Sequence, residues 1–298
     1  MANTIGWGQA AVNNTIDWCK GKTNNTIGWG TIYSSSPYGD TDLIGTPAGD
    51  ADALAFISAA AITDATQKSA IETLVVDLKG YGIWSKMKAL YPFVGGTAAQ
   101  HKFNLKNPID SDSAFRLVFN GGWVHSSTGS KPNGVNAFAN SFFNPSLHNV
   151  ENSSHISYYS RTLYTDASGA GEIGCLSTDI YRNLINASIN GTTYCLPNNR
   201  GEVVVNFSSN GVGFLLASRT SATAIMGQRN STQYTNTATT ARVNEKIGIG
   251  ALGYIGSFAF FSPRESAFAS IGDGLTDTEA ANYYTAVQAF QTTLGRNV

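Results

Sequence analysis

The fold is decided by the stretch Ile185-Asn186-Ala187-Ser188-Ile189-Asn190-Gly191-Thr192-Thr193-Tyr194-Cys195. Asparagine and glycine both tolerate the positive φ angles that a type I′ turn requires at its two central positions. The flanking residues include the β-branched and aromatic types that favour strands. The sequence therefore predicts a β-hairpin that turns at Asn190-Gly191, and Asn210-Gly211 repeats the same signal.

The same strand-like composition extends from about Gly95 towards the C-terminus. Short runs rich in Val, Ile, Phe, Tyr and Thr are separated by Gly, Asn and Ser at intervals of roughly 8 to 12 residues, a rhythm typical of all-β folds. We therefore expect a mainly β domain over residues 95–298, built as an antiparallel jelly-roll sandwich of the concanavalin-like type. Examples of the predicted strands are residues 114–119, 155–161, 202–207, 212–219 and 254–262.

A helical segment is predicted before the sandwich, over residues 49–94. Asp50 and Asp64 are candidate N-caps for two helices, and the second helix is expected to end near Gly80. Apolar residues recur at spacings of three and four, which gives each helix a stripe that faces either the core or a partner. The stripe comprises Leu54, Ile57 and Ala61, then Ile71, Leu74, Val75 and Leu78. A third short turn is expected over residues 83–90.

A further helix is predicted at the C-terminal end. Thr276 and Glu279 have the spacing of a capping box, in which each side chain bonds the other residue's backbone N–H. We expect the helix that they open to dock on the sandwich, because its apolar residues share one face. These residues are Ala280, Tyr283, Tyr284, Val287, Phe290 and Leu294, before Gly295.

The first 48 residues contain three copies of one short unit, and their tryptophans lie at positions 7, 18 and 29. Each Ile/Trp pair needs an apolar partner that the intervening Asn and Gly cannot supply. We interpret residues 1–48 as an extended arm and linker that contacts another chain, although packing against the protein's own body remains an alternative. The candidate anchoring residues are Ile5, Trp7, Ile16, Trp18, Ile27 and Trp29.

Composition argues against several classes of partner. Only 13% of residues are charged, the formal net charge is −1, and no cluster of Lys and Arg offers the phosphate neutralisation that nucleic-acid binding needs. No apolar stretch is long enough to cross a bilayer, and no secretory signal is evident, so we expect no membrane insertion and synthesis in the cytoplasm. Three cysteines without CxxC spacing predict neither a disulfide framework nor a zinc site.

Motifs for catalysis are weak, and we predict neither enzymatic activity nor a cofactor. The seven glutamates, Glu172 among them, are scattered without the alternating acidic run expected of a glycosidase on this fold, so solvation is their expected role. A carboxylate pair joined from distant strands remains an alternative. Asp40-Thr41-Asp42 and Asp110-Ser111-Asp112 could supply calcium ligands, but turn residues are the preferred interpretation. Residues 169–174 and 248–253 match Gly-x-Gly-x-x-Gly, but both precede strand-like sequence rather than a helix.

The most ligand-like stretch is Asn120-Gly121-Gly122-Trp123-Val124-His125-Ser126-Ser127. An exposed tryptophan beside Asn, His and Ser could stack on a sugar face and bond its hydroxyls. Trp123 and His125 are therefore candidate glycan contacts. The preferred alternative is a buried tryptophan at a glycine-rich bend, because tryptophan in a sandwich usually supplies core area.

Four segments have a distinctive sequence: Lys79–Gly96, His101–Leu105, Ser157–Arg161 and Ser270–Leu275. They resemble the concanavalin-like, laminin-G-like jelly-roll appendage proteins of tailed phages of Bacteroidetes, the crAss-like group included, and the resemblance covers residues 50–298. The Ile-Gly-Trp-Gly repeats of the arm resemble N-terminal anchors in such proteins. The resemblance implies a place in the virion, as a capsid head fibre or a tail appendage, and an oligomer, often a trimer.

The sequence thus predicts a non-enzymatic structural virion protein of a tailed phage, made in the host bacterial cytoplasm and attached to capsid or tail proteins by its arm. The alternative is a carbohydrate-binding adhesin module that recognises host surface glycans. The two roles are compatible on one virion.

Overall fold

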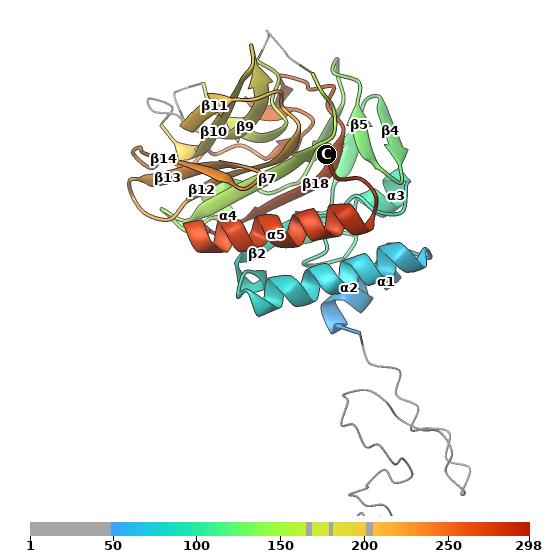
Figure 1. The fold of residues 1–298 in the computed structure, drawn as a ribbon. Helices are drawn as coiled ribbons and strands as arrows, with labels where there is room; N and C mark the ends of the chain where they lie inside the picture. Colours follow the sequence, from blue (N-terminus) through green and yellow to red (C-terminus); the bar gives the residue numbers. More distant parts are fainter. Residues whose placement is uncertain (1–48, 165–168, 179–180, 201–204) are drawn as a thin grey trace, which may run out of the picture. The chain divides into compact units, whose positions relative to one another are not determined.

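The computed structural model describes residues 49–164, 169–178, 181–200 and 205–298, so the six anchoring residues predicted in the arm lie outside the described residues. Residues 50–298 form one compact unit, in which two β-sheets pack face to face and helices cover the outer face of one of them (Figure 1). The predicted class, a mainly β antiparallel sandwich with a C-terminal helix, is confirmed. The predicted domain boundary between residues 94 and 95 is not a boundary between compact units, because the helical segment and the sandwich belong to the same unit, residues 50–298.

The first sheet, which we call the helix-covered sheet, contains the long central strands of the body. Its strands pair antiparallel, and β2 (Met87–Tyr91) pairs with the central strand β18 beside the main order. The order is β14 (Thr232–Thr237), β13 (Ala224–Arg229), β12 (Gly213–Arg219), β7 (Ser154–Ser160), β18 (Ser266–Gly272), β5 (Gly129–Pro132) and β4 (Trp123–Ser126).

The second sheet, which we call the outer sheet, packs against the other face of the central strands. Beside its main order, β16 (Leu252–Tyr254) pairs with β17 (Ser257–Ala259) and runs parallel to β8 at one position. The order is β11 (Val205–Ser208), β10 (Thr192–Asn199), β9 (Arg182–Ile189), β8 (Ile173–Leu176), β15 (Gly248–Ile249), β6 (Phe138–Asn140) and β3 (Val118–Asn120).

The hairpin predicted at Asn190-Gly191 is confirmed. Strands β9 and β10 pair antiparallel across it, and the two turn residues have φ angles of 49° and 80°, as a type I′ turn requires. The second Asn-Gly prediction, Asn210-Gly211, is wrong as a hairpin: β11 before it belongs to the outer sheet, and β12 after it belongs to the helix-covered sheet. Long-range pairing of β12 with β7 and β13 overrides the local turn signal.

Two helices open the body, and both predicted N-caps are confirmed. The Asp50 carboxylate accepts from the Asp52 N–H at the start of α1 (Ala51–Ala59), and the Asp64 carboxylate accepts from the Gln67 N–H at the start of α2 (Ala65–Gly80). The third turn, predicted over 83–90, is a 3₁₀ turn only at Trp84–Lys86, because the following residues pair with β18 as strand β2.

Three short helical segments lie between strands: α3 (Ala98–His101) and a 3₁₀ turn at Asp112–Ala114 lie between β2 and β3, and α4 (Pro145–His148) lies between β6 and β7. Two predicted strands are shorter than expected. The strand expected over 114–119 begins only at Val118, because Phe115 takes a left-handed conformation with φ 60°. The strand expected over 254–262 is broken at Ile255, whose φ is 51°, and forms the hairpin of β16 and β17.

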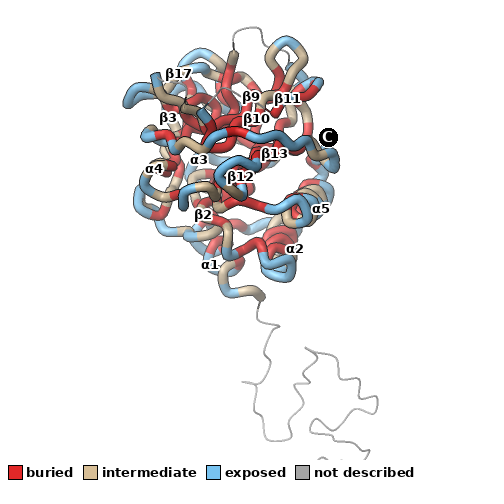
Figure 2. Tube along the Cα trace, turned by 90° about the vertical axis from the view of Figure 1, so that its left-hand side faces the viewer, coloured by how far each residue is buried: buried red, intermediate tan, exposed pale blue. Residues whose placement is uncertain are grey.

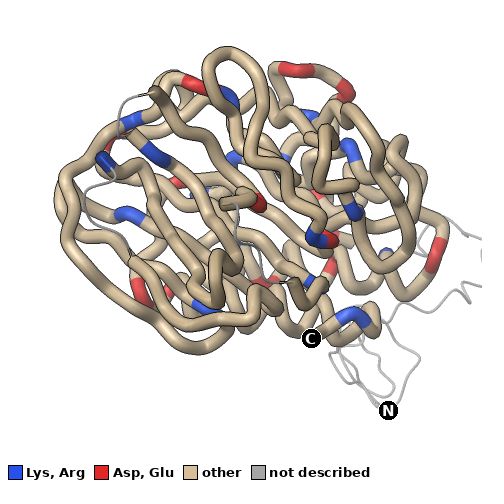
Figure 3. Tube along the Cα trace, turned by 90° about the horizontal axis from the view of Figure 1, so that it is seen from above, with Lys and Arg blue, Asp and Glu red and all other residues tan. Residues whose placement is uncertain are grey.

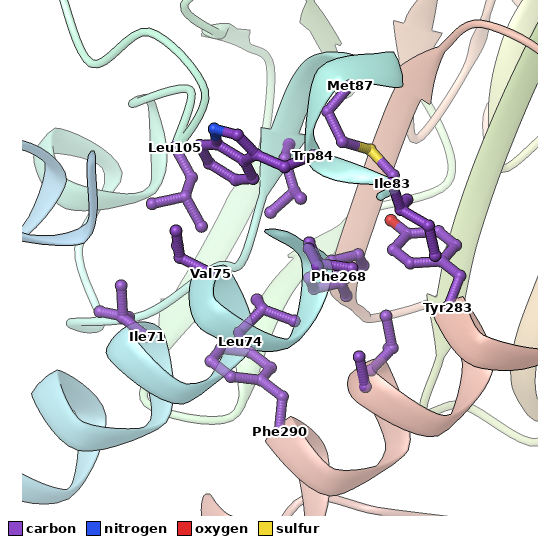
Figure 4. Packing of buried hydrophobic residues seen from close by; sticks show 14 of the residues in the cluster. Ile71, Leu74, Val75, Ile83, Trp84, Met87, Leu105, Phe268, Tyr283 and Phe290 are labelled. Carbon is purple, nitrogen blue, oxygen red and sulfur yellow. The ribbon is translucent and has the colours of Figure 1, made fainter. Parts of the chain in front are cut away.

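The C-terminal helix α5 (Asp277–Thr293) confirms the capping box of Thr276 and Glu279. Its buried residues, Tyr283 and Phe290 among them, pack against α2 and against Phe268 of the sheet (Figure 4). None of the helices in the described part of the chain is long and apolar enough to cross a membrane.

The central strands are buried on both faces, which explains their nearly continuous apolar sequence. In β12, Phe214 and Leu216 belong to the cluster under the helices, whereas Leu215 and Ala217 belong to the cluster between the sheets. Every residue of β7, β12 and β18 is buried, and Figure 2 shows this buried layer enclosed by exposed loops and helix faces.

The apolar stripe of α2 faces the core. Ile71, Leu74, Val75 and Leu78 are at most 1% exposed and pack with Trp84 and Phe290 (Figure 4). The expectation that this stripe offers area to partner chains is therefore wrong, because α5 and the sheet already cover it. The oligomeric state stays a prediction.

We predict that Leu74→Ala lowers the free energy of unfolding by about 2–5 kcal/mol, because it leaves a cavity in a fully packed layer. Val76→Ala on the same helix removes a side chain that is 55% exposed, and should change stability by no more than about 0.5 kcal/mol. Thermal or urea unfolding of the two variants provides the measurement. A Leu74→Ala protein of unchanged stability but altered oligomeric state would contradict the core assignment.

Candidate functional site

The surroundings of Glu172 differ from the solvated role predicted for it. It was expected to be solvated, but it is fully buried, and its Oε1 lies 2.6 Å from Nη1 of Arg264. The same oxygen accepts from the Ser262 hydroxyl at 2.8 Å, and Oε2 accepts from the Ala187 N–H. Burial raises the pKa of the Glu172 carboxyl, although Arg264 and the hydrogen bonds oppose this shift.

A raised pKa on a buried carboxyl is typical of catalytic acids, but the geometry here is structural. The Glu172 oxygens are held by an arginine, a hydroxyl and a backbone amide, and the residue lines neither of the two surface clefts described below. Arg264 also donates to the backbone carbonyls of Tyr164 and Ser188. The pair thus joins the residue before β8 to segments distant in sequence. The solvation prediction is wrong because the partner that allows burial of Glu172, Arg264, lies 92 residues away in sequence.

Trp123 and His125, the candidate glycan contacts, lie on the edge strand β4. The Trp123 ring is half-buried, and its Nε1–H donates to the Asn120 carbonyl at 3.0 Å. A Cβ built on Gly250 would come within 2.8 Å of the ring, so the ring packs closely on that glycine. Phe119 contacts Trp123 edge-on. These contacts fit the packing alternative, and glycan contact by Trp123 stays a prediction.

His125 pairs with His101 through their Nδ1 atoms, which lie 3.0 Å apart. One Nδ1 must therefore carry a proton and donate to the other, and the two rings cannot both be charged at this distance without repulsion. Burial lowers the pKa of His101 to about 3, and the neighbouring His125 and Arg296 add to the shift. Burial also lowers the pKa of His125. The pair holds the two rings together inside the body, and glycan contact by His125 stays a prediction.

A surface cleft of about 270 Å³, which we call the amide cleft, lies between the ends of the outer-sheet strands and the loop before β15. Three chain segments, residues 140–144, 244–246 and 256–258, contribute to it. Its lining residues are Asn140, Asn144, Asn244, Glu245, Lys246, Gly256, Ser257 and Phe258.

The polar groups of the amide cleft are held in place by one another. Asn144 Nδ2 donates to Asn244 Oδ1 at 3.0 Å, and both Glu245 oxygens accept from the Gly256 N–H at 3.0 Å. Phe258 is half-buried and stacks on Phe138 with ring centroids 4.3 Å apart. The cleft therefore presents fixed amide and carboxylate groups beside an aromatic ring.

A second cleft, of about 360 Å³, is lined by two arginines, one glutamate and one tyrosine among other residues, and we call it the arginine cleft. Arg242 Nη1 donates to the backbone carbonyls of Ser146 at 3.3 Å and Asn149 at 3.2 Å. The lining residues are Ser146, Glu151, Tyr181, Arg200, Thr239, Thr240, Ala241 and Arg242.

Sequence analysis missed both clefts, because each is assembled from loops that are up to about 120 residues apart. The local signal was a polar run, Asn244-Glu245-Lys246, followed by Ser257-Phe258, and such runs are common in loops. The calcium alternative at Asp110 and Asp112 is not favoured, because these carboxylates pair with Lys102 and Arg116. Asp40 and Asp42 lie outside the described residues.

The metal-ligating side chains of the described residues form no group of three or more that could hold a metal ion. Both described cysteines, Cys175 and Cys195, are buried free thiols in the core between the sheets. The two Gly-x-Gly-x-x-Gly segments form β8, β15 and β16, which confirms that they are strand and turn segments.

No protein-family model and no curated protein sequence matches the chain. Among solved structures, it is similar to the binding domain of botulinum neurotoxin serotype D, with a TM-score of 0.42 and 10% identity over 69% of this chain and 52% of that one. It thus spans about half the length of that domain. A mutant Trypanosoma rangeli sialidase with trans-sialidase activity gives a TM-score of 0.48 and 9% identity, over 74% of this chain and 39% of that one.

Domain 4 of AbnA, an extracellular arabinanase from Geobacillus stearothermophilus solved with arabinotriose, gives a TM-score of 0.39 and 11% identity, over 67% of this chain and 98% of that one. At these identities, the three likenesses concern the β-sandwich fold alone.

The buried histidines predict a loss of stability in acid. In the unfolded chain a histidine takes up a proton near pH 6.5, whereas burial lowers the folded-state pKa of His101 to about 3 and that of His155 to about 4. The folded protein binds fewer protons between these values, so stability is fully present above about pH 6.5 and falls as the pH decreases. From about pH 7 to pH 5 we expect a loss of about 2 kcal/mol for each histidine.

Urea unfolding at a series of pH values measures this slope. His101→Gln should remove about half of it, whatever the stability of the variant at neutral pH. An unchanged slope would contradict the lowered pKa of His101.

Proposed function

We propose that residues 50–298 form a carbohydrate-binding module and that the amide cleft binds a host surface glycan. The observation that carries this proposal is the combination of fixed carboxamides, a carboxylate and an aromatic ring in one cleft of about 270 Å³. Sugar hydroxyls both donate and accept hydrogen bonds, and a sugar ring has an apolar C–H face that stacks on aromatic rings. The cleft offers a group for each of these features.

The groups of the amide cleft are oriented before any ligand arrives. Asn140 Oδ1 accepts from the Phe142 N–H at 2.9 Å, which fixes the plane of its amide. Asn244 Oδ1 is engaged by Asn144, so its Nδ2 group stays available as a donor. Glu245 uses one lone pair of each oxygen on Gly256 and keeps others. Such preorganisation lowers the entropic cost of binding.

Binding without hydrolysis is the activity we propose. Glycoside hydrolysis ordinarily uses two carboxyl groups about 5 to 9.5 Å apart, one on each side of the scissile bond. Among the residues that the structure describes, each cleft is lined by a single carboxylate, Glu245 in one and Glu151 in the other. The buried Glu172 is committed to Arg264.

The proposed setting is the virion of a tailed phage, as a head fibre or tail appendage anchored by the arm. Support comes from the sequence resemblance over residues 50–298 and from the three Ile/Trp units of residues 1–48. A symmetric oligomer, often a trimer in the resembled family, would present several weak glycan sites together. Multivalent presentation raises overall avidity without any new contact.

We predict that Phe258→Ala weakens glycan binding about tenfold, since loss of one aromatic contact costs roughly 1 kcal/mol or more. Asn244→Ala should weaken it to a similar degree by removing an oriented amide donor. Tyr81→Ala is the matched control, because Tyr81 is a 40% exposed aromatic at the end of α2 that lines neither cleft. A glycan array selects the ligand, and calorimetry measures each affinity.

The same assays test the absence of turnover. Chromatography of the bound glycan after long incubation should show no shorter products. Release of products that stops on Glu245→Gln would make the protein an enzyme. Binding that is lost in Trp123→Ala but retained in Phe258→Ala would move the glycan site to β4.

A separate prediction concerns the arm. Deleting residues 1–36 should leave the melting temperature of the 50–298 body nearly unchanged, because the body has its own packed cores. The deletion should abolish incorporation into virions, and Trp18→Ala should reduce it partially. Quantitative mass spectrometry of purified particles measures copy number. Normal copy number in the deletion variant, or unfolding of the body, would refute the anchor role.

A further inference from the structure

The two clefts share a wall. On one loop, Asn144 lines the amide cleft and Ser146 lines the arginine cleft. On the neighbouring loop, Asn244 lines the amide cleft and Arg242 lines the arginine cleft. The two halves of the wall are joined by a hydrogen bond from the Ser146 N–H to the Val243 carbonyl, at 3.1 Å. The clefts therefore lie on either side of one thin partition.

The wall is fixed to the core. Pro145 and Val243, the residues between the cleft-lining pairs, are both buried, and Val243 belongs to the cluster between the sheets. Ligand pockets usually have volumes of about 300 to 1,000 Å³. The arginine cleft, at about 360 Å³, lies at the small end of this range, and the amide cleft, at about 270 Å³, lies just below it. A ligand larger than one or two sugar rings must cross the rim of the wall.

The arginine cleft is suited to an anion. Arg242 is exposed, and two backbone carbonyls hold its Nη1. Its Nε and Nη2 have no hydrogen-bond partner among the described residues, and neither Arg242 nor Glu151 forms an ion pair with another described residue. A guanidinium held in this way keeps planar N–H donors, which match the geometry of a carboxylate.

The two clefts differ in the charged residues that line them. Charged residues are few and scattered over the described part of the chain (Figure 3), yet three cations, Arg200, Arg242 and Lys246, line these neighbouring clefts with two carboxylates. One of these carboxylates, Glu245, accepts from the Gly256 N–H with both oxygens. The amide cleft holds one cation and one carboxylate, so the accessible N–H donors of Arg242 in the arginine cleft, rather than net charge, favour an acidic ligand.

We propose that the ligand is a linear acidic glycan that spans both clefts, with one sugar in the amide cleft and the carboxylate of a neighbouring uronic-acid residue on Arg242. This inference rests on the proposed function, because it names the class of glycan that the same surface binds. Tyr181, which also lines the arginine cleft, is the residue that we expect to give the acidic sugar an aromatic contact.

The test uses the full chain and three acidic polymers: polygalacturonate, alginate and hyaluronan. Each is compared with the same polymer after its carboxyl groups have been reduced to alcohols. We expect at least one acidic polymer to bind at least tenfold more tightly than its reduced form. Affinity should also rise at least tenfold from the monosaccharide to the hexasaccharide, because only the longer chain reaches both clefts.

Arg242→Gln should abolish the preference for the acidic form, and Lys131→Gln, an exposed cation of β5 that lines neither cleft, should preserve it. Added salt should weaken binding of the acidic form by the wild type more than binding of the reduced form. This measurement needs no variant, so it holds even if Arg242→Gln disturbs the wall.

The outcomes separate this inference from the proposed function. Equal binding of acidic and reduced polymers, with a loss on Phe258→Ala, would keep the glycan module and overturn the acidic ligand. Equal affinity for monosaccharide and hexasaccharide would overturn the two-cleft span. Failure of every acidic polymer together with every glycan of a neutral array would overturn both.

Discussion

The structure depends on a layer of strands that is buried on both faces. Strands β7, β12 and β18 lie between the outer sheet and the helices, so their alternating side chains must satisfy two different apolar surroundings at once. This constraint explains why α2 and α5 cannot present their stripes to partners: both are needed to cover the sheet. It also explains why the exposed loops at the strand ends are the part of the body with freedom to form clefts.

Local sequence signals predicted the elements whose ends are set by local chemistry. The Asn190-Gly191 turn, the two aspartate caps and the capping box at Thr276 all depend on residues within four positions of one another, so they could be found without the fold. The failures share a different cause. At Asn210-Gly211 and in β2, pairing with strands far away in sequence decided the conformation.

The candidate site was beyond sequence reasoning for the same reason. An exposed-looking tryptophan was visible at Trp123, but its ring packs closely on Gly250, a residue that only the fold identifies as a neighbour. Glu172 looked like one of many scattered carboxylates until Arg264 was placed beside it. The clefts combine Asn140 and Asn144 with residues about 100 positions later, and no local spacing encodes that meeting. What the sequence did convey was a surface poor in charge and rich in amides and hydroxyls.

Within that sparse set of charges, four arginines illustrate two structural roles. Arg219, Arg264 and Arg296 are fully buried, and each donates to several backbone carbonyls; Arg296, for example, joins the end of α5 to Pro92, Phe93 and Ala267. Guanidinium groups suit this use because five donors in one plane can satisfy carbonyls that no strand partner reaches. Arg242 uses the same chemistry at the surface, where two carbonyls take up one nitrogen and the rest of the group stays accessible. Hydrogen bonds from arginine to backbone carbonyls therefore join segments of the core and also orient Arg242 at the surface. The wall between the two clefts is held in place because its buried residues are packed into that core.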